Sequence, residues 1–109
     1  MIMFAIDDSN DLERLIQLNE IVVALMSDMS CNVCLAIYPE LEAMSRRYSN
    51  VIFASADVAS IKTLVGQHMI FLYPTIIVFV MGKETVRFER VFSLKDVESA
   101  INRYTEILH

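Results

Sequence analysis

The chain has 109 residues, of which 55% are hydrophobic, and its formal net charge is −5 at pH 7. This length and apolar content suit a single domain over residues 1–109 that builds its core without a disulfide framework. An acidic chain whose basic residues are scattered binds polyanions poorly, so we expect no nucleic-acid partner.

The first part of the chain is predicted to form a strand, a helix and a second strand. Residues 2–6 are a short apolar run typical of a strand, and the DDSN stretch that follows offers several helix N-caps. Apolar residues then recur at helical spacing over residues 12–19. Residues 21–27 (IVVALMS) are continuously apolar and rich in β-branched side chains, which indicates a central strand buried on both faces.

The remainder of the chain continues this alternation. A helix over residues 34–48 is predicted from the i, i+3, i+4 and i+7 spacing of its apolar residues, with Pro39 inside it. The later elements are predicted to be a strand over 51–58, a helix over 61–68, a strand over 75–81, a turn at 82–83, a half-exposed strand over 84–91, and a capping box at 93–96 that starts a helix ending at 108.

This order of elements predicts an α/β fold. Strands that alternate with helices favour a parallel core sheet with helices on both faces. The final hairpin adds antiparallel strands at one side, which gives a central mixed sheet of about five strands flanked by about four helices.

No segment is predicted to direct export or membrane insertion. The start of the chain has no basic segment and turns acidic at Asp7, unlike a secretory signal. The longest apolar run, residues 69–81, is interrupted by Pro74 and is too short to span a bilayer. We therefore expect a cytoplasmic protein with no membrane partner, whose thiols are kept reduced.

Cys31 and Cys34 are the two cysteines of the chain, and they lie between a buried strand and a helix. In a reducing compartment a C-x-x-C pair is more often redox-active or metal-binding than structural. At a helix N-terminus, free N–H groups and the helix dipole stabilise the Cys31 thiolate, and the i, i+3 spacing brings Cys34 to the same sulfur. Cys31 is the predicted nucleophile, and Cys34 is the thiol that resolves the mixed disulfide.

The chain resembles the thioredoxin family over nearly its whole length. The matching marks are CNVC after a buried strand, a proline five residues past the second cysteine, YPT before the strand over 75–81, and VMGKE at the hairpin. The resemblance implies the thioredoxin fold and dithiol–disulfide exchange without a cofactor. It also implies a cis Tyr73–Pro74 bond that faces the cysteines, with the Tyr73 backbone offered to an extended substrate. The implied partners are protein or small-thiol disulfides and an unidentified reductase, and a monomer is expected.

Several residues depart from the family's pattern and remove most of the electrostatic apparatus of general thioredoxins. The departures are Ser30 for the tryptophan, Asn32 and Val33 for the Gly-Pro pair, Leu25 for the buried acid, Ser55 for the lysine of the next strand, and Val91 or Phe92 for the glycine just past the antiparallel strand. Of these, Ser30, Asn32 and Leu25 are expected to modulate the site.

An apolar rim that contacts substrate is expected beside the cysteines. Met29 lies in the loop before Cys31, and Met69 lies shortly before Pro74. Asp28 is the acid nearest to Cys31 in sequence and would oppose its thiolate. The predicted substrate contacts are Met29, Val33, Tyr73 and Pro74.

The cysteines have two other interpretations. They can be core thiols without a role, because free cysteine is often buried. They can also bind metal, but zinc takes four ligands, and beyond the cysteines the chain offers only His68, expected to be a packed side chain, and His109. We therefore expect no metal within one chain, and a cluster shared between two chains stays open.

Two functions follow from these observations. The first is an enzyme, a thiol–disulfide oxidoreductase that acts on protein disulfides through Cys31 and Cys34. The second is a thioredoxin-fold protein-binding module or redox switch with little general reductase activity, since a fold alone does not fix a function.

Overall fold

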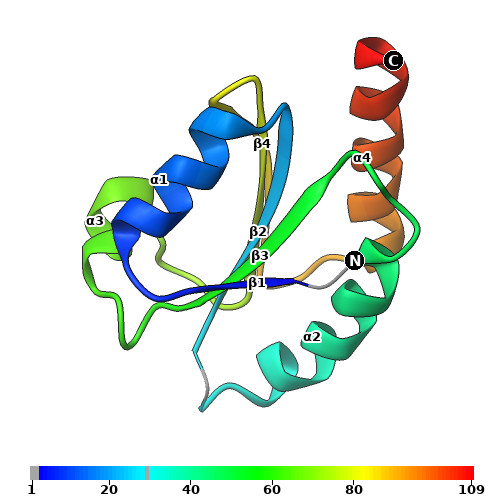
Figure 1. Ribbon diagram of the computed structural model, residues 1–109. Coiled ribbons are helices and arrows are strands. Elements are labelled where there is room, and N and C mark those ends of the chain that lie inside the picture. The colour runs from blue at the N-terminus through cyan, green and yellow to red at the C-terminus, as the bar shows by residue number, and fades with distance from the viewer. Residues whose placement is uncertain (1–2, 29) are drawn as a thin grey trace.

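A mixed sheet covered by helices on both faces forms the framework of the protein (Figure 1). The computed structural model describes residues 3–28 and 30–109, and five strands and four helices lie within these ranges. The strands are β1 (Phe4–Ile6), β2 (Ile21–Ser27), β3 (Ile52–Asp57), β4 (Thr75–Val80) and β5 (Lys83–Glu89). The helices are α1 (Ser9–Leu18), α2 (Asn32–Ser45), α3 (Thr63–His68) and α4 (Leu94–Leu108).

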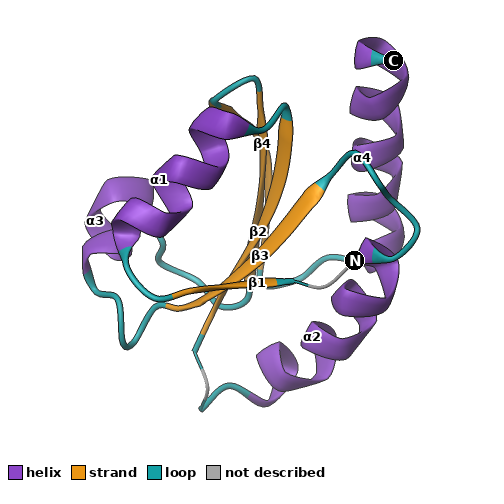
Figure 2. Cartoon of the chain, viewed as in Figure 1, coloured by secondary structure: helices purple, strands orange, loops and turns teal. Residues whose placement is uncertain are grey.

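The strand order in the sheet is β1-β3-β2-β4-β5. The strands β1, β3 and β2 run parallel, while β4 is antiparallel to β2 and β5 is antiparallel to β4. Figure 2 shows the helices packed against this sheet. The prediction of an α/β fold with a mixed sheet flanked by helices is confirmed.

Strand β2 separates two apolar layers. All seven of its residues are buried, and successive side chains point to opposite faces. Val22, Ala24 and Met26 join the cluster that contains side chains of α1 and α3. Val23 and Leu25 join the cluster that contains side chains of α2 and α4. This arrangement explains why the stretch reads as continuously apolar. The strand ends at Ser27, four residues before Cys31.

Helix α2 begins and ends earlier than the apolar periodicity predicts. It runs over Asn32–Ser45 rather than 34–48, with Cys31 as its N-cap and Arg46 as its C-cap. The periodicity continues to Tyr48 because the Tyr48 ring lies 6.1 Å from the ring of Phe53 and packs against the same core after the helix has ended.

The hairpin turn lies one residue before its predicted position. Met81 and Gly82 form the turn with φ values of 52° and 85°, and Lys83 is already paired with Val80 in the sheet. Two central residues with positive φ are the signature of the turn that matches the twist of a two-residue hairpin. The register also shifts between Val78 and Phe79, a local irregularity of the β4–β5 ladder.

Candidate redox site

Cys31 occupies the N-cap of α2. Its Sγ accepts a hydrogen bond from the backbone N–H of Cys34 at 3.3 Å, and its own N–H donates to the Asp28 carbonyl at 2.9 Å. Hydrogen bonds from the Cys34 side chain and backbone lower the pKa of Cys31, and the negative charge of Asp28 partly opposes this. The sulfur is partly exposed, so the more acidic thiol of the pair is also the more accessible one.

Cys34 lies one turn along the same helix and has the opposite properties. Only 2% of its surface is exposed. Burial, and then the hydrogen bond and charge of Cys31, raise the pKa of Cys34 to about 11. Both cysteines are free thiols in the structure. The site therefore pairs an accessible, acidic thiol with a protected, protonated one.

Asp28 and Ser30 shape the loop before the helix. The Asp28 carboxylate accepts hydrogen bonds from the Ser30 N–H at 2.9 Å and from its hydroxyl at 2.7 Å. These two hydrogen bonds lower the pKa of Asp28, which keeps it ionised close to Cys31. Ser30 therefore holds the acid that opposes the thiolate, while Asn32 is the exposed first residue of α2.

A groove of about 340 Å³ opens beside the Cys31 thiol. It brings together Val33 and Tyr73, which the sequence predicted as substrate contacts. Met69 is exposed but does not line the groove, and Met29 lies outside the described residues. The lining residues are Asp28, Cys31, Val33, Phe71, Leu72, Tyr73 and Arg90.

The 71–73 segment of this groove is fixed from two sides. Arg87 of β5 donates to the carbonyls of His68 and Met69 at 2.7 and 3.1 Å, which ties the end of α3 to the sheet. The Thr75 hydroxyl donates to the Leu72 carbonyl at 2.7 Å. The Tyr73–Pro74 peptide bond is cis and Pro74 is buried. Residues far apart in the sequence thus form one wall beside the cysteine pair.

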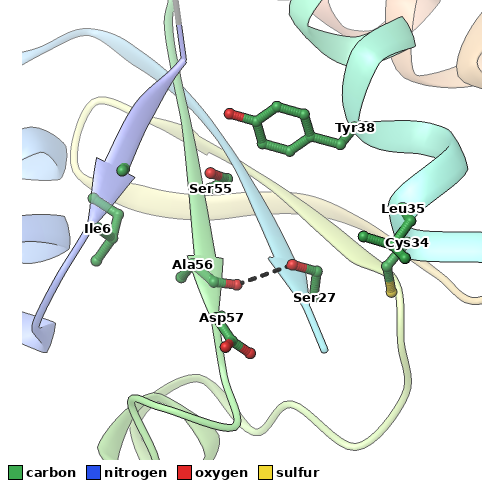
Figure 3. Close-up of a pocket in the computed structure, with 9 residues that line it drawn as sticks. Ile6, Ser27, Cys34, Leu35, Tyr38, Ser55, Ala56 and Asp57 are labelled. Carbon is green, nitrogen blue, oxygen red and sulfur yellow. Dashed lines mark hydrogen bonds between the residues drawn. The ribbon is translucent and has the colours of Figure 1, made fainter. Parts of the chain in front are cut away.

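A second cavity, of about 370 Å³, lies behind the buried thiol (Figure 3). The Tyr38 side chain extends from α2 toward the strands, and the Ser27 hydroxyl donates to the Ala56 carbonyl at 3.3 Å (Figure 3). Of the described residues that line this cavity, Asp57 alone carries a charge. The lining residues are Ala5, Ile6, Ser27, Cys34, Leu35, Tyr38, Ser55, Ala56 and Asp57.

Leu25 and Ser55 are register partners on β2 and β3. Leu25 is fully buried in the cluster beneath α2 and α4, whereas Ser55 lines the cavity behind Cys34. An aliphatic side chain and a hydroxyl thus occupy the two positions where the family's pattern has an acid and a lysine. Neither side chain is charged, so this pair supplies no ionised group to the buried thiol.

Both histidines lie away from the cysteines. His68 Nε2 lies 3.4 Å from a Glu13 carboxylate oxygen, and the His68 ring packs edge-on against Phe79. His109 Nε2 lies 3.3 Å from a Glu20 carboxylate oxygen. Within the described residues, no three His, Cys, Asp or Glu side chains are grouped to hold a metal ion. Nor does any described helix have the length and apolar character needed to cross a membrane.

The sequence analysis missed three lining residues of the Cys31 groove. Phe71 and Leu72 read only as part of a long apolar run, although Phe71 is 68% exposed. Arg90 was overlooked because the position just past the antiparallel strand was assigned to Val91 or Phe92. That assignment is wrong: β5 ends at Glu89, so Arg90 follows it directly, and its φ is 58°.

A C-x-x-C pair at the start of a helix, next to a surface groove in an α/β fold with a mixed sheet, defines a thioredoxin-fold dithiol site. The family model described as Thioredoxin matches residues 4–103. The chain therefore belongs to the thioredoxin family. The cysteine pair within this domain supports thiol–disulfide oxidoreductase chemistry at the family level.

Individual relatives agree with this assignment. "Thioredoxin domain-containing protein 8" of Mus musculus is 37% identical over 67% of the chain, which spans only 58% of that relative's length. "Thioredoxin" of Echinococcus granulosus is 30% identical over 71% of the chain and 72% of its own length. The solved structure of Fasciola hepatica thioredoxin matches with a TM-score of 0.86 and 26% identity, covering 94% of this chain and 99% of that one.

Proposed function

We propose that the protein is a thiol–disulfide oxidoreductase that reduces protein disulfides through Cys31 and Cys34. The observation that carries this proposal is the hydrogen bond from the Cys34 N–H to Cys31 Sγ at 3.3 Å, beside an open groove. It favours a thiolate at the one sulfur of the pair that a substrate can reach.

The reaction divides into two exchanges. The Cys31 thiolate attacks one sulfur of the substrate disulfide, the substrate S–S bond breaks, and the first substrate thiolate leaves and takes up a proton. Cys34 then loses its proton and attacks Cys31 Sγ, which releases the second substrate thiolate and leaves a Cys31–Cys34 disulfide. Two electrons have passed to the substrate, and an external dithiol or reductase returns the pair to the reduced state without a cofactor on this chain.

The groove supplies the substrate contacts in this proposal. Val33 and Tyr73 line it beside Cys31, and Pro74 is buried next to them. The Tyr73 backbone is the proposed hydrogen-bonding edge for an extended substrate segment. Ser30 and Leu25 are proposed to modulate the site, the first by holding Asp28 ionised and the second by withholding a buried charge. Asn32 is a third modulating position.

The wider setting completes the proposal. The chain acts as one domain over residues 1–109, as a monomer, in a reducing compartment such as the cytoplasm, where a reductase regenerates its thiols. Its substrates are protein disulfides or small-thiol disulfides.

Trapping tests this function. Incubation of the Cys34→Ser protein with a disulfide-bonded peptide is expected to yield a mixed disulfide on Cys31, since the resolving thiol is gone. The Cys31→Ser protein is the matched control and is expected to trap nothing. Turnover of the same peptide by the unmodified protein with a dithiol present completes the test, and a protein that neither traps nor turns over the peptide would refute the proposal.

A binding module or redox switch is the second candidate. The exposed apolar side chains of Val33, Phe71 and Leu72 around Cys31 favour it, because such a rim can hold a partner without chemistry. The presence of Leu25 where the family's pattern has a buried acid also favours a binding module or redox switch. Equilibration of the cysteine pair with a dithiol at a measurable potential, together with turnover of a disulfide peptide, would exclude this alternative.

A further inference from the structure

Arg90 holds an unusual place beside the cysteine pair. It directly follows β5 with a φ of 58°, a backbone region that residues other than glycine seldom adopt. Its N–H donates to the Pro74 carbonyl at 2.8 Å, so the Arg90 backbone is tied to the wall of the groove. Strained positions of this kind persist where the surrounding structure fixes them, and they cluster at functional sites.

The charge of Arg90 is not used within the protein. Arg90 is exposed and lines the groove together with Cys31 and Tyr73. Among the described residues, Arg90, Arg46 and Arg103 make no ion pair, whereas Arg14, Arg47 and Arg87 each pair with an acid, and of the three unpaired arginines Arg90 is the one in this groove. An exposed arginine at a substrate groove, without a carboxylate partner, is placed to bind one from outside.

Asp28 is the other charged group in the groove, and it does not neutralise Arg90. The Asp28 carboxylate accepts two hydrogen bonds from Ser30 and lies more than 4.0 Å from the Arg90 guanidinium, since no ion pair joins them. The groove therefore has an acidic and a basic side. An extended substrate that crosses it meets Arg90 next to the 71–73 wall and Asp28 next to the cysteine loop.

We infer that Arg90 is a specificity-determining residue, which selects disulfide-bearing peptide segments with a carboxylate next to the reacting cysteine. The substrate class rests on the proposed function. A peptide is the occupant because the same groove offers Phe71, Leu72 and Tyr73 as an apolar surface for its neighbouring side chains. This selection concerns the binding of substrate, because any effect of Arg90 on the Cys31 thiolate is the same for two peptides that differ only in one charge.

Two activated peptides test this selection in a single step. They are identical except for Glu or Gln next to one cysteine, which is carried as a neutral pyridyl disulfide. In the Cys34→Ser protein, Cys31 attacks the peptide sulfur, a Cys31–peptide disulfide forms, and the thiopyridine leaves and is followed by its absorbance. The Glu peptide is expected to react about threefold faster than the Gln peptide, the size expected for one unit charge across a solvated groove, and this ratio should fall as salt is added.

Variants of Arg90 assign the effect to its charge. Arg90→Gln in the same background is expected to bring the ratio to about one, and Arg90→Lys to retain most of it. Arg46→Gln is the matched control, because Arg46 is an exposed arginine at the opposite end of α2 and its loss changes the net charge equally. A ratio of one in the starting protein, or a ratio that survives Arg90→Gln, overturns the inference.

Two further measurements separate this inference from the proposed function. If the Cys34→Ser protein does not trap an ordinary disulfide peptide and the unmodified protein does not turn it over, the function is refuted, while the activated peptides still decide the role of Arg90. The pyridyl disulfide of glutathione is the second measurement, since it carries carboxylates without apolar side chains and has the same leaving group as the two peptides. If it reacts faster than the Glu peptide in an Arg90-dependent manner, the peptide assignment is wrong.

Discussion

The backbone N–H of Cys34 points at the sulfur of Cys31 from 3.3 Å, within the first turn of α2. This hydrogen bond joins the Cys34 backbone to the Cys31 thiol, and the two thiols differ in acidity. It favours the charged form of Cys31, while burial disfavours the charged form of Cys34.

Alkylation should distinguish the two thiols, because their pKa values differ. The pKa of Cys31 is lowered, so its thiolate forms as the pH rises through a value below that of an ordinary thiol. The pKa of Cys34 is about 11, and its side chain is buried, so it stays protonated at neutral pH. Iodoacetamide at neutral pH should label Cys31 alone, as located by peptide mass spectrometry. Faster labelling of Cys34 would reverse the assigned roles.

The Cys34 side chain should itself help to keep Cys31 acidic. Its hydrogen bond is the largest cause of the lowered Cys31 pKa. Cys34→Ala removes this donor and should raise the Cys31 pKa, whereas Cys34→Ser retains an O–H donor and should raise it less. The ultraviolet absorbance of the thiolate across a pH titration measures both values. Equal Cys31 pKa values in the two variants would show that the backbone N–H acts alone.

The hairpin offers a test of stability away from the site. Met81 has a φ of 52° in the first position of a two-residue turn, where asparagine is favoured. Met81→Asn should therefore stabilise the protein by about 0.5–1 kcal/mol, which corresponds to a rise in Tm of about 2–6 °C. Val91→Asn is the control, because Val91 is equally an exposed apolar residue but has no positive φ. Thermal unfolding measures both, and a gain shared by the control would remove the turn as the cause.

The framework of the fold could be predicted from the sequence because its signals are local. The continuous apolar run of β2 and the helical spacing in α4 identify elements without any knowledge of their partners. The positions where helices and strands end depend more on contacts with distant residues. Tyr48 continues the helical pattern of α2 although it packs beyond the helix, so the predicted end was late.

Spacing alone predicted the site only where its residues are close in sequence, while the expectation for Tyr73 came from the resemblance to the thioredoxin family. Cys31 and Cys34 share one helix turn, and spacing alone brings them together. Arg90 lines the same groove as Cys31 and directly follows β5, where an irregular register inserts Thr85 between the pairs Val78–Val86 and Phe79–Glu84. Simple alternation along the strand cannot show such an insertion, so the residue that follows the strand could not be identified from the pattern.

Leu25 should limit the second exchange. Replacing it with an acid, Leu25→Asp, should raise the pKa of Cys31 and speed release of the mixed disulfide, because a buried carboxylate can take the Cys34 proton. The same change should destabilise the fold by about 3–5 kcal/mol, since it buries an acid in the cluster under α2 and α4.

The stability of that variant gives a second readout. Burial raises the pKa of the introduced carboxyl above its unfolded value of about 4, so the folded state retains the proton longer. Its stability should therefore fall as the pH rises above about 4. Leu25→Asn is the control for lost packing without charge. Release no faster in folded Leu25→Asp than in Leu25→Asn would leave Leu25 as a packing residue only.

Asp57 should speed release of the mixed disulfide, whereas Asp28 should slow it. Asp57 lines the cavity behind Cys34, where a carboxylate can accept the Cys34 proton directly or through water. Asp57→Asn removes that acceptor while it retains an oxygen for the N–H of Ala59, 3.3 Å away. We expect release of the mixed disulfide to slow by about tenfold, a modest general-base effect.

Asp28→Asn is the matched comparison, because it also removes one carboxylate near the cysteines. The charge of Asp28 raises the pKa of both thiols, so its removal should make Cys34 easier to ionise and should speed release. Stopped-flow measurement of release, with folding checked by circular dichroism, compares the two variants with the unmodified protein. If both variants speed release, Asp57 acts only through its charge, as Asp28 does, and Cys34 loses its proton by another route.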